Sequence, residues 1–251
     1  MDLAPGVVTP GWFDLRGVIQ GLPWPDVRGK RCLDIGTYDG HLAFELERRG
    51  ASEVIATDIA DHDAWDWPPR TRARGPEILR QLAGSEKGRG FEIARGLLGS
   101  AVERRPVSVY DLGPATVGTF DVVVCGSLLL HLRDPLRALE AIRSVCGECF
   151  MSIEQVELRT SVFARRSPLL LLDGLSDRLQ WLLPNVAAHR GMLRAAGFDV
   201  ERESGIFSEP YGPSHPPVGH SPRALCVSLA RRLLTGGDGV PHHALLARPA
   251  L

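Results

Sequence analysis

Short apolar runs alternate with segments of helical periodicity along most of the chain. Seven apolar, partly β-branched runs are predicted as strands, at residues 31–36, 53–58, 107–111, 120–125, 149–156, 198–203 and 224–229. Helices are predicted between them at residues 41–49, 91–98, 134–145 and 185–196. The alternation predicts an α/β fold: a Rossmann-like, doubly wound sheet of seven mostly parallel strands with helices on both faces. The last two strands follow each other directly, which is compatible with an antiparallel strand at or near the sheet edge.

Two long irregular segments interrupt this alternation. Residues 59–90 are rich in Trp, Pro and Arg, and residues 157–184 follow the fifth predicted strand. We expect both insertions to cap the carboxyl end of the sheet, where open α/β folds bind ligands. The chain then divides into an N-terminal segment (1–29) over the ligand site, a Rossmann-like domain (30–235) and a loose C-terminal tail (236–251).

Composition narrows the class of protein. The 251 residues carry a formal net charge of −1, which argues against holding nucleic acid by bulk charge alone. No apolar run approaches the roughly 18 residues that a membrane span needs, and no secretory signal is visible, so a cytoplasmic protein is expected. The five cysteines include Cys146 and Cys149 in a CxxC spacing, but no second pair completes a metal site. No metal is expected.

The strongest chemical signal is the segment 33–40 (LDIGTYDG), which joins the first strand to the first helix. Glycine at positions 36 and 40 lets the backbone approach a ligand closely. Asp58 ends the next strand, where a carboxylate can accept hydrogen bonds from ribose hydroxyls. The order D-x-G-x-x-x-G departs from the dinucleotide pattern, and Asp39 would repel a phosphate. The segment therefore indicates a nucleoside ligand without phosphate.

This order resembles motif I of the class I S-adenosylmethionine-dependent methyltransferases. The resemblance implies S-adenosyl-L-methionine as the cofactor. Two later segments fit the same superfamily: Tyr110-Asp111-Leu112 resembles the stretch that flanks adenine, and Gly126-Ser127 resembles the turn beneath the transferred methyl group. The residues implied to bind the cofactor in these segments are Asp34, Gly36, Thr37, Gly40, Asp58, Ile59, Asp111, Leu112 and Gly126.

A closer resemblance covers most of the chain. Segments 29–30, 45–51, 108–112 and 126–135 are similar to the group related to the tRNA wobble-uridine (carboxy)methyltransferases, and Trp12 and Arg16 resemble an aromatic and basic pair that lines the cofactor site there. In that group a tyrosine that binds the extra carboxylate of a carboxylated cofactor precedes the motif's histidine. Leu130 takes its place here, which favours plain methyl transfer. Short relatives of this type resemble tailoring enzymes of bacterial natural-product pathways.

His131 is the leading candidate for a catalytic base. It lies five residues past Gly126 and titrates near neutrality. Its alternative role is structural, either orienting the loop or capping the helix that Asp134-Pro135 opens. His41, just after motif I, is a candidate contact for the cofactor carboxylate.

Acceptor-binding candidates come from the two insertions and the fifth strand. Trp65 and Trp67 would suit a flat acceptor, or would instead anchor the loop. Trp181 would contact substrate or pack the cap, and Glu154 is a candidate second base.

These observations favour methyl transfer from S-adenosylmethionine to a heteroatom, oxygen rather than nitrogen, of a small natural-product acceptor. One alternative is a tRNA uridine O-methyltransferase, which requires a continuous basic surface leading to the pocket. A second alternative is a cofactor-binding protein without catalysis, whose acceptor pocket would be occluded. A homodimer is possible, and the sequence does not decide the oligomeric state.

Overall fold

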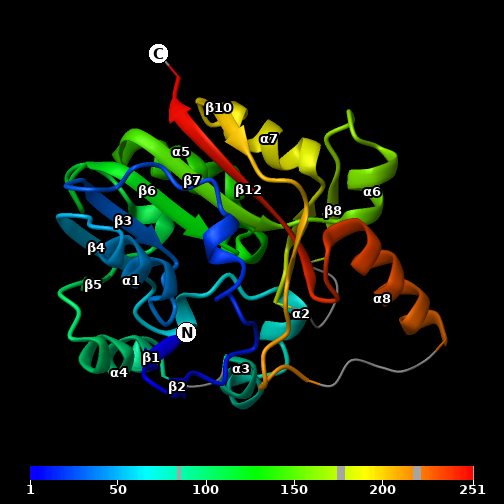
Figure 1. Ribbon diagram of the computed structural model, residues 1–251, viewed down its shortest axis with the longest axis horizontal. Helices are drawn as coiled ribbons and strands as arrows, with labels where there is room; N and C mark the ends of the chain where they lie inside the picture. Colours follow the sequence, from blue (N-terminus) through cyan, green and yellow to red (C-terminus); the bar gives the residue numbers. More distant parts are fainter. Residues whose placement is uncertain (84–85, 174–178, 217–221, 251) are drawn as a thin grey trace.

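The computed structural model describes residues 1–83, 86–173, 179–216 and 222–250. Its centre is an eight-stranded sheet with the order β10-β12-β7-β6-β3-β4-β5, and β11 also pairs with β12 (Figure 1). The strands are β3 (Arg31–Ile35), β4 (Glu53–Asp58), β5 (Glu103–Pro106), β6 (Phe120–Gly126), β7 (Cys146–Gln155), β10 (Phe198–Glu203), β11 (Phe207–Glu209) and β12 (Val240–Pro249). The predicted α/β fold class, with its mostly parallel sheet, is confirmed.

Helices cover both faces of the sheet and create two apolar layers. One layer packs α5 (Pro135–Val145) and α7 (Val186–Ala195) against side chains such as Leu33 and Val123. The other packs α1 (His41–Arg48), α4 (Arg89–Leu98) and the turn η1 (Ile19–Gly21) against Cys32 and Val122. Because neighbouring residues of one strand point to opposite faces, consecutive residues of the central strands, such as Cys32 and Leu33, enter different layers.

The third predicted strand, residues 107–111, is placed wrongly. The strand in this region is β5, with the polar sequence ERRP, and residues Val109–Asp111 form a 3₁₀ turn, η3. The Ser108 side chain caps that turn by accepting a hydrogen bond from the Tyr110 amide. β5 is the strand at one edge of the sheet, and its side chains are partly exposed. Its sequence therefore lacks the apolar run that predicts a buried strand.

The end of the chain differs most from the expectation. Residues predicted as a seventh strand, 224–229, lie within α8 (Pro222–Thr235), and the tail predicted to be loose contains β12. This strand is antiparallel to both β7 and β10 and lies between them. The run Ala244–Ala247 is fully buried in the core. An internal strand of the sheet therefore comes from residues 236–251, which were predicted to form a loose C-terminal tail.

The insertions and the N-terminal segment contain short elements. Residues 59–90 form η2 (His62–Ala64), α2 (Pro69–Arg72) and α3 (Pro76–Ala83) before α4 begins, and residues 157–184 form α6 (Leu158–Phe163), β8 (Leu170–Leu172) and β9 (Leu182–Pro184). The N-terminal hairpin pairs β1 (Asp2–Ala4) with β2 (Val7–Val8). In Figure 1, α2 lies beyond the arrowheads of β3 and β6, at the carboxyl edge of the sheet. Within the described residues, no helix has the length and apolarity to cross a bilayer.

Candidate active site

The turn between β3 and α1 brings backbone, rather than side chains, to the sheet edge. Gly36 and Gly40 have φ angles of +70° and +88°, in the left-handed region that glycine adopts without strain. The amides of Gly36 and Thr37 both donate to the Thr57 carbonyl, at 2.8 and 3.0 Å, which ties the turn to β4. Protein side chains fill the space beside both glycines, with Leu128 next to Gly36 and the Phe44 ring next to Gly40. Contact of Gly36 and Gly40 with the cofactor stays a prediction.

Gly40 has no room for a side chain. An added Cβ would lie 2.7 Å from Cδ2 of Phe91 and would also meet the Phe44 ring. Because the left-handed φ adds a further penalty, we expect Gly40→Ala to lower the free energy of unfolding by about 2–4 kcal/mol, measured by urea titration. The matched control is Gly96→Ala in α4, where nothing lies within 4 Å of the added Cβ; it should stabilise the helix by about 0.5–1 kcal/mol. Equal effects of the two substitutions would contradict this packing.

Asp34 stabilises the turn through a hydrogen bond to Thr37. Its side chain is buried, and its Oδ2 accepts a hydrogen bond of 2.7 Å from the Thr37 hydroxyl. Burial raises the pKa of Asp34 to about 7, against the effect of that hydrogen bond. Direct contact of Asp34 and Thr37 with the cofactor stays a prediction.

Asp58 lies at the end of β4 with its carboxylate already engaged. Oδ2 accepts from the Tyr38 amide at 3.1 Å, and Oδ1 accepts from the Ile59 amide at 2.8 Å. Lys87 forms an ion pair with Oδ2 at 3.1 Å, and both side chains are only 8% exposed. The Lys87 ammonium also lies 5.2 Å from the Tyr38 ring and 5.0 Å from the Trp65 ring. Nothing in the local sequence pointed to Lys87, because the pair joins an insertion to a strand 29 residues away.

These features fit a nucleoside ligand with one condition. The glycine turn and a buried carboxylate at the neighbouring strand end are present, as ribose binding at this edge requires. The ribose hydroxyls must, however, displace Lys87 from Asp58 or share the carboxylate with it.

The predicted adenine segment lies in η3. Leu112 is buried, whereas Asp111 is exposed. The neighbouring Tyr110 hydroxyl donates to Asp66 at 2.6 Å and accepts from the Asp134 amide at 3.1 Å. This segment therefore connects the first insertion to the start of α5.

Asp66 joins the two insertions, a role that the sequence did not indicate. Its side chain also accepts from the Arg133 amide at 2.9 Å, and its carbonyl accepts from Trp181 Nε1 at 2.6 Å. The Trp181 amide donates to the Leu130 carbonyl at 2.7 Å. Trp181 thus holds the two insertions and the loop before α5 together, which agrees with its alternative role in packing the cap.

His131 lies in the turn η4 (Leu129–His131), among aromatic residues of the first insertion. Its Nδ1 is 2.5 Å from the Leu179 carbonyl, so Nδ1–H donates and Nε2 carries the lone pair of the neutral ring. Trp65 meets this ring edge-on at 5.9 Å. Burial lowers the pKa of His131 and keeps the ring neutral at pH 7. Trp67 is buried, and its Nε1 donates to the His62 carbonyl at 2.7 Å, as expected of a loop anchor.

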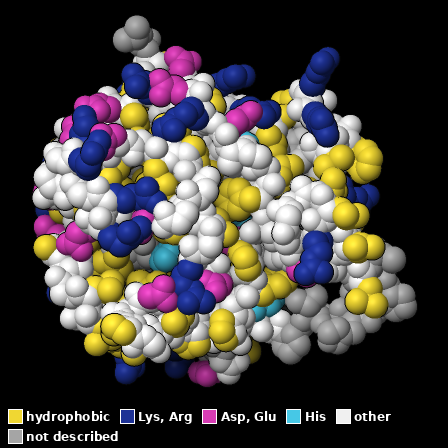
Figure 2. All heavy atoms as spheres, in the orientation of Figure 1, with side chains coloured by type: hydrophobic (Ala, Val, Ile, Leu, Met, Phe, Trp, Pro, Cys, Tyr) yellow, Lys and Arg dark blue, Asp and Glu magenta, His cyan; other side chains and the backbone are white. Residues whose placement is uncertain are grey.

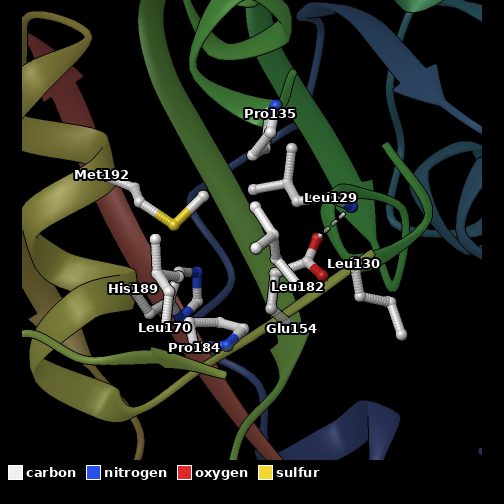
Figure 3. Close-up of a pocket in the computed structure, with 9 residues that line it drawn as sticks. All are labelled: Leu129, Leu130, Pro135, Glu154, Leu170, Leu182, Pro184, His189 and Met192. Atoms are coloured by element: carbon white, nitrogen blue, oxygen red, sulfur yellow. Dashed lines mark hydrogen bonds between the residues drawn. The ribbon is translucent and has the colours of Figure 1, made fainter. Parts of the chain in front are cut away.

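Glu154 lies at the end of β7, beneath η4. Its Oε1 accepts from the amides of Leu128 and Leu129, at 3.3 and 3.2 Å, while Oε2 has no partner among the described residues. Burial raises the pKa of Glu154 to about 7. The carboxylate is one of the groups that line a small cavity of about 10 Å³, room for about one water molecule. Figure 3 shows it among the apolar side chains that line the same cavity. The hydrogen bonds of Oε1 hold the start of η4 in place, and the role of Glu154 as a second base stays a prediction.

Trp12 and Arg16 have other partners at the surface. Trp12 is 62% exposed and meets the His215 ring edge-on at 6.2 Å. The Arg16 guanidinium pairs with Asp14 at 2.7 Å and Asp2 at 3.1 Å. Their place in the cofactor site stays a prediction.

The turn after β6 contains a second histidine site that the sequence analysis missed. Gly126 leaves little room beside it, since an added Cβ would lie 2.9 Å from Cδ1 of Leu42. The Ser127 hydroxyl lies 3.0 Å from Nε2 of His242, and the same nitrogen lies 2.7 Å from Glu209 Oε2. Both partners come from the end of the chain, where no catalytic residue was expected.

Comparisons with known proteins agree with this arrangement. A family described as "Methyltransferase domain" matches residues 15–203. The ubiquinone biosynthesis O-methyltransferase of Neisseria meningitidis serogroup C is 29% identical over 188 residues, covering 72% of this chain and 68% of the relative.

Two solved structures share the fold. The magnesium protoporphyrin IX methyltransferase of Synechocystis PCC 6803, with bound S-adenosylhomocysteine, has a TM-score of 0.51 at 17% identity and covers 93% of this chain and 78% of its own. The 1,6-didemethyltoxoflavin-N1-methyltransferase of Burkholderia thailandensis, also with S-adenosylhomocysteine, has a TM-score of 0.53 at 16% identity. The match covers 89% of this chain and 72% of that protein.

The predicted enzyme class is therefore confirmed, whereas the closer resemblance to the tRNA wobble-uridine group is not. The family match spans most of the chain and includes the glycine turn, Asp58 and the turn after β6. The chain belongs to the methyltransferase-domain family.

Proposed function

We propose that the chain transfers a methyl group from S-adenosyl-L-methionine to an oxygen atom of a small molecule. The observation that carries this proposal is the left-handed glycine turn at residues 36–40 beside the buried carboxylate of Asp58. When bound, the cofactor would supply an electrophilic methyl group on sulfur. The O-methyltransferase among the relatives supports oxygen as the acceptor atom.

The acceptor class follows from the groups around His131. The half-buried Trp65 ring meets the His131 ring edge-on, with 5.9 Å between the ring centroids, and the buried Trp67 ring packs against Trp65 at 5.2 Å. Trp65 thus offers a flat apolar contact beside His131. The hydrogen bonds of Asp66 and Trp181 hold the two insertions together over the same edge. A flat or cyclic metabolite, such as a natural-product intermediate, would suit these surroundings better than a folded nucleic acid.

The charge distribution also disfavours the tRNA alternative. Figure 2 shows Lys and Arg side chains interspersed with Asp and Glu over the visible face. Many arginines have acidic partners, including Arg31 with Glu53 and Arg190 with Glu203. A protein that binds tRNA through a continuous basic surface would lose affinity for the RNA steeply as the salt concentration rises.

Incubation with methyl-labelled S-adenosylmethionine distinguishes these functions. Pure protein is supplied in parallel with bulk tRNA and with a small-metabolite extract of the producing cells. We expect the label in a low-mass product. Label in RNA would favour the tRNA alternative instead, and cofactor binding with no transfer to either would favour the non-catalytic alternative.

His131 is one proposed proton acceptor for this reaction. Its lone pair lies on Nε2, and Trp65 packs beside the ring. Burial lowers the pKa of His131, which makes the ring a weak base at neutral pH.

A further inference from the structure

The second insertion (residues 157–184) contains a hairpin that lies outside the central sheet. Among the described residues, its strands β8 and β9 pair with each other and with no other strand. The β9 side of the hairpin is tied to the domain, because the Trp181 amide donates to the Leu130 carbonyl at 2.7 Å and the Pro184 carbonyl accepts from the Glu157 amide at 2.8 Å. β8 is therefore the outer strand.

Half of the polar backbone groups of β8 face an open edge. In an antiparallel pair, every second residue directs both its N–H and its C=O group at the partner strand. The Asp173 amide donates to the Trp181 carbonyl at 2.9 Å, so Asp173, like Leu171 two residues earlier, faces β9. The backbone groups of Leu170 and Leu172 consequently point away from β9, to an edge where no described strand pairs with them.

The side chains at this edge are apolar on both faces of the strand. Leu169 and the three leucines of β8 are 42–59% exposed, although neighbouring residues of a strand point to opposite faces. Phe163, at the end of α6, is 87% exposed. Free strand edges are normally protected by charged residues or proline, and residues 169–172 include neither. An apolar edge of this kind requires a cover.

α8 extends the exposed apolar surface at the same end of the molecule. Leu225, Leu229 and Leu233 recur every four residues, so they share one face of the helix, and each is at least 58% exposed. Arg231, on the opposite face, reaches the Tyr211 hydroxyl at 3.4 Å. The helix thus turns its apolar face away from the domain, the reverse of an ordinary surface helix. Figure 1 shows α6, β8 and α8 at one end of the molecule, and Figure 2 shows hydrophobic side chains over that end.

The exposed area suits a contact between protein chains. At roughly 180 Å² for each fully exposed residue of this size, these eight apolar residues present about 900 Å². A stable interface buries about 800 Å² on each partner. A lipid bilayer would cover the leucines but would leave the backbone groups of the open edge unpaired in hydrocarbon, which membranes do not tolerate. Another strand satisfies both requirements.

We propose that this surface binds a second copy of the chain, through antiparallel pairing of β8 with β8 of the other copy. With Leu171 on the twofold axis, Leu170 of each copy lies opposite Leu172 of the other, and the two exchange both backbone hydrogen bonds. The same pairing directs Asp173, which follows β8, toward the end of the other β8 that follows the exposed Arg165 and Arg166. Opposite charges therefore approach each other on both sides of the axis, which favours a second copy over an unrelated partner.

The interface lies close to the candidate active site. Trp181 bonds to β8 through Asp173 and to the domain through Leu130, the residue before His131. His131 in turn donates to the Leu179 carbonyl of the same insertion. A second copy on β8 therefore holds in place the segment that orients His131. The inference itself does not depend on the proposed reaction.

The test is sedimentation of the full chain over a range of micromolar concentrations. We expect a species of twice the 27.4 kDa of one chain. Leu171→Glu places two like charges opposite each other at the axis and should raise the dissociation constant of the dimer about 10-fold or more. The matched control is Leu97→Glu on α4, where the leucine is 58% exposed; it should leave the dimer unchanged.

A charge-reversal pair makes the test specific to this register. Leu171→Arg should also separate the copies, and an equimolar mixture of Leu171→Arg with Leu171→Glu should recover the dimer, because position 171 faces itself across the axis. A wild-type chain that stays monomeric, a dimer that Leu171→Glu leaves intact, or a mixture that does not recover would each overturn the proposal. A monomer that instead sediments with vesicles of phosphatidylglycerol and phosphatidylcholine would assign the surface to lipid and overturn it as well.

Discussion

Deletion of residues 240–250 is expected to abolish cooperative folding. These residues include β12, which lies between β7 and β10. Their loss would separate β10 from the sheet and leave one edge of β7 unpaired. The milder test is Leu245→Ala, because Leu245 is fully buried in the layer that contains α5 and α7. Its truncation should lower the free energy of unfolding by about 2–5 kcal/mol in a urea titration.

The control on the same strand is Arg248→Ala. The Arg248 side chain is 62% exposed and pairs with Glu201 at the surface, where such a pair contributes about 0–1 kcal/mol. A truncated protein that still unfolds cooperatively with the stability of the full chain would show that β12 is not an integral strand. Leu245→Ala with an effect as small as Arg248→Ala would show the same.

Asp58→Asn is expected to weaken binding of S-adenosylhomocysteine about 10- to 100-fold in calorimetry. The reason is that ribose hydroxyls would lose charge-assisted hydrogen bonds, each contributing about 1.5–3 kcal/mol. The same substitution leaves the buried Lys87 ammonium without its carboxylate, so stability should fall as well. Weak binding could then reflect a disturbed fold, and a second variant must separate the two effects.

Lys87→Met separates them. It keeps most of the apolar stem between Tyr38 and Trp65 and frees Asp58, so S-adenosylhomocysteine should bind several-fold more tightly. The double variant Asp58→Asn/Lys87→Met should recover stability relative to Asp58→Asn but still bind weakly. If Lys87→Met instead weakens binding as much as Asp58→Asn does, Lys87 is a cofactor contact rather than a competitor for the carboxylate.

The central part of the fold could be predicted because its signals are local. β3, β4 and β6 are buried on both faces, so each contains a run of apolar residues that faces both layers. The predictions for the regions of β5 and β12 were wrong for different reasons. β5 is a polar strand at an end of the sheet, and β12 follows a glycine-rich stretch that is typical of a loose tail.

The candidate site likewise contains some residues that the sequence predicts and others that it does not. The glycine turn and Asp58 were found because one strand–turn–helix–strand unit contains both. Lys87, Asp66 and the pair of Glu209 with His242 depend on contacts between segments far apart in the sequence. No spacing rule links such residues, and only the folded chain brings them together.

The most direct measurement is NMR of the product formed from S-adenosylmethionine labelled with ¹³C in its methyl group. Purified protein and the small-metabolite extract should yield an enzyme-dependent methoxy resonance in the low-mass fraction. That resonance should be strongly reduced with Asp58→Asn. A labelled methyl group on nitrogen or in RNA, or a methoxy signal that Asp58→Asn leaves undiminished, would contradict the proposed transfer to a small-molecule oxygen.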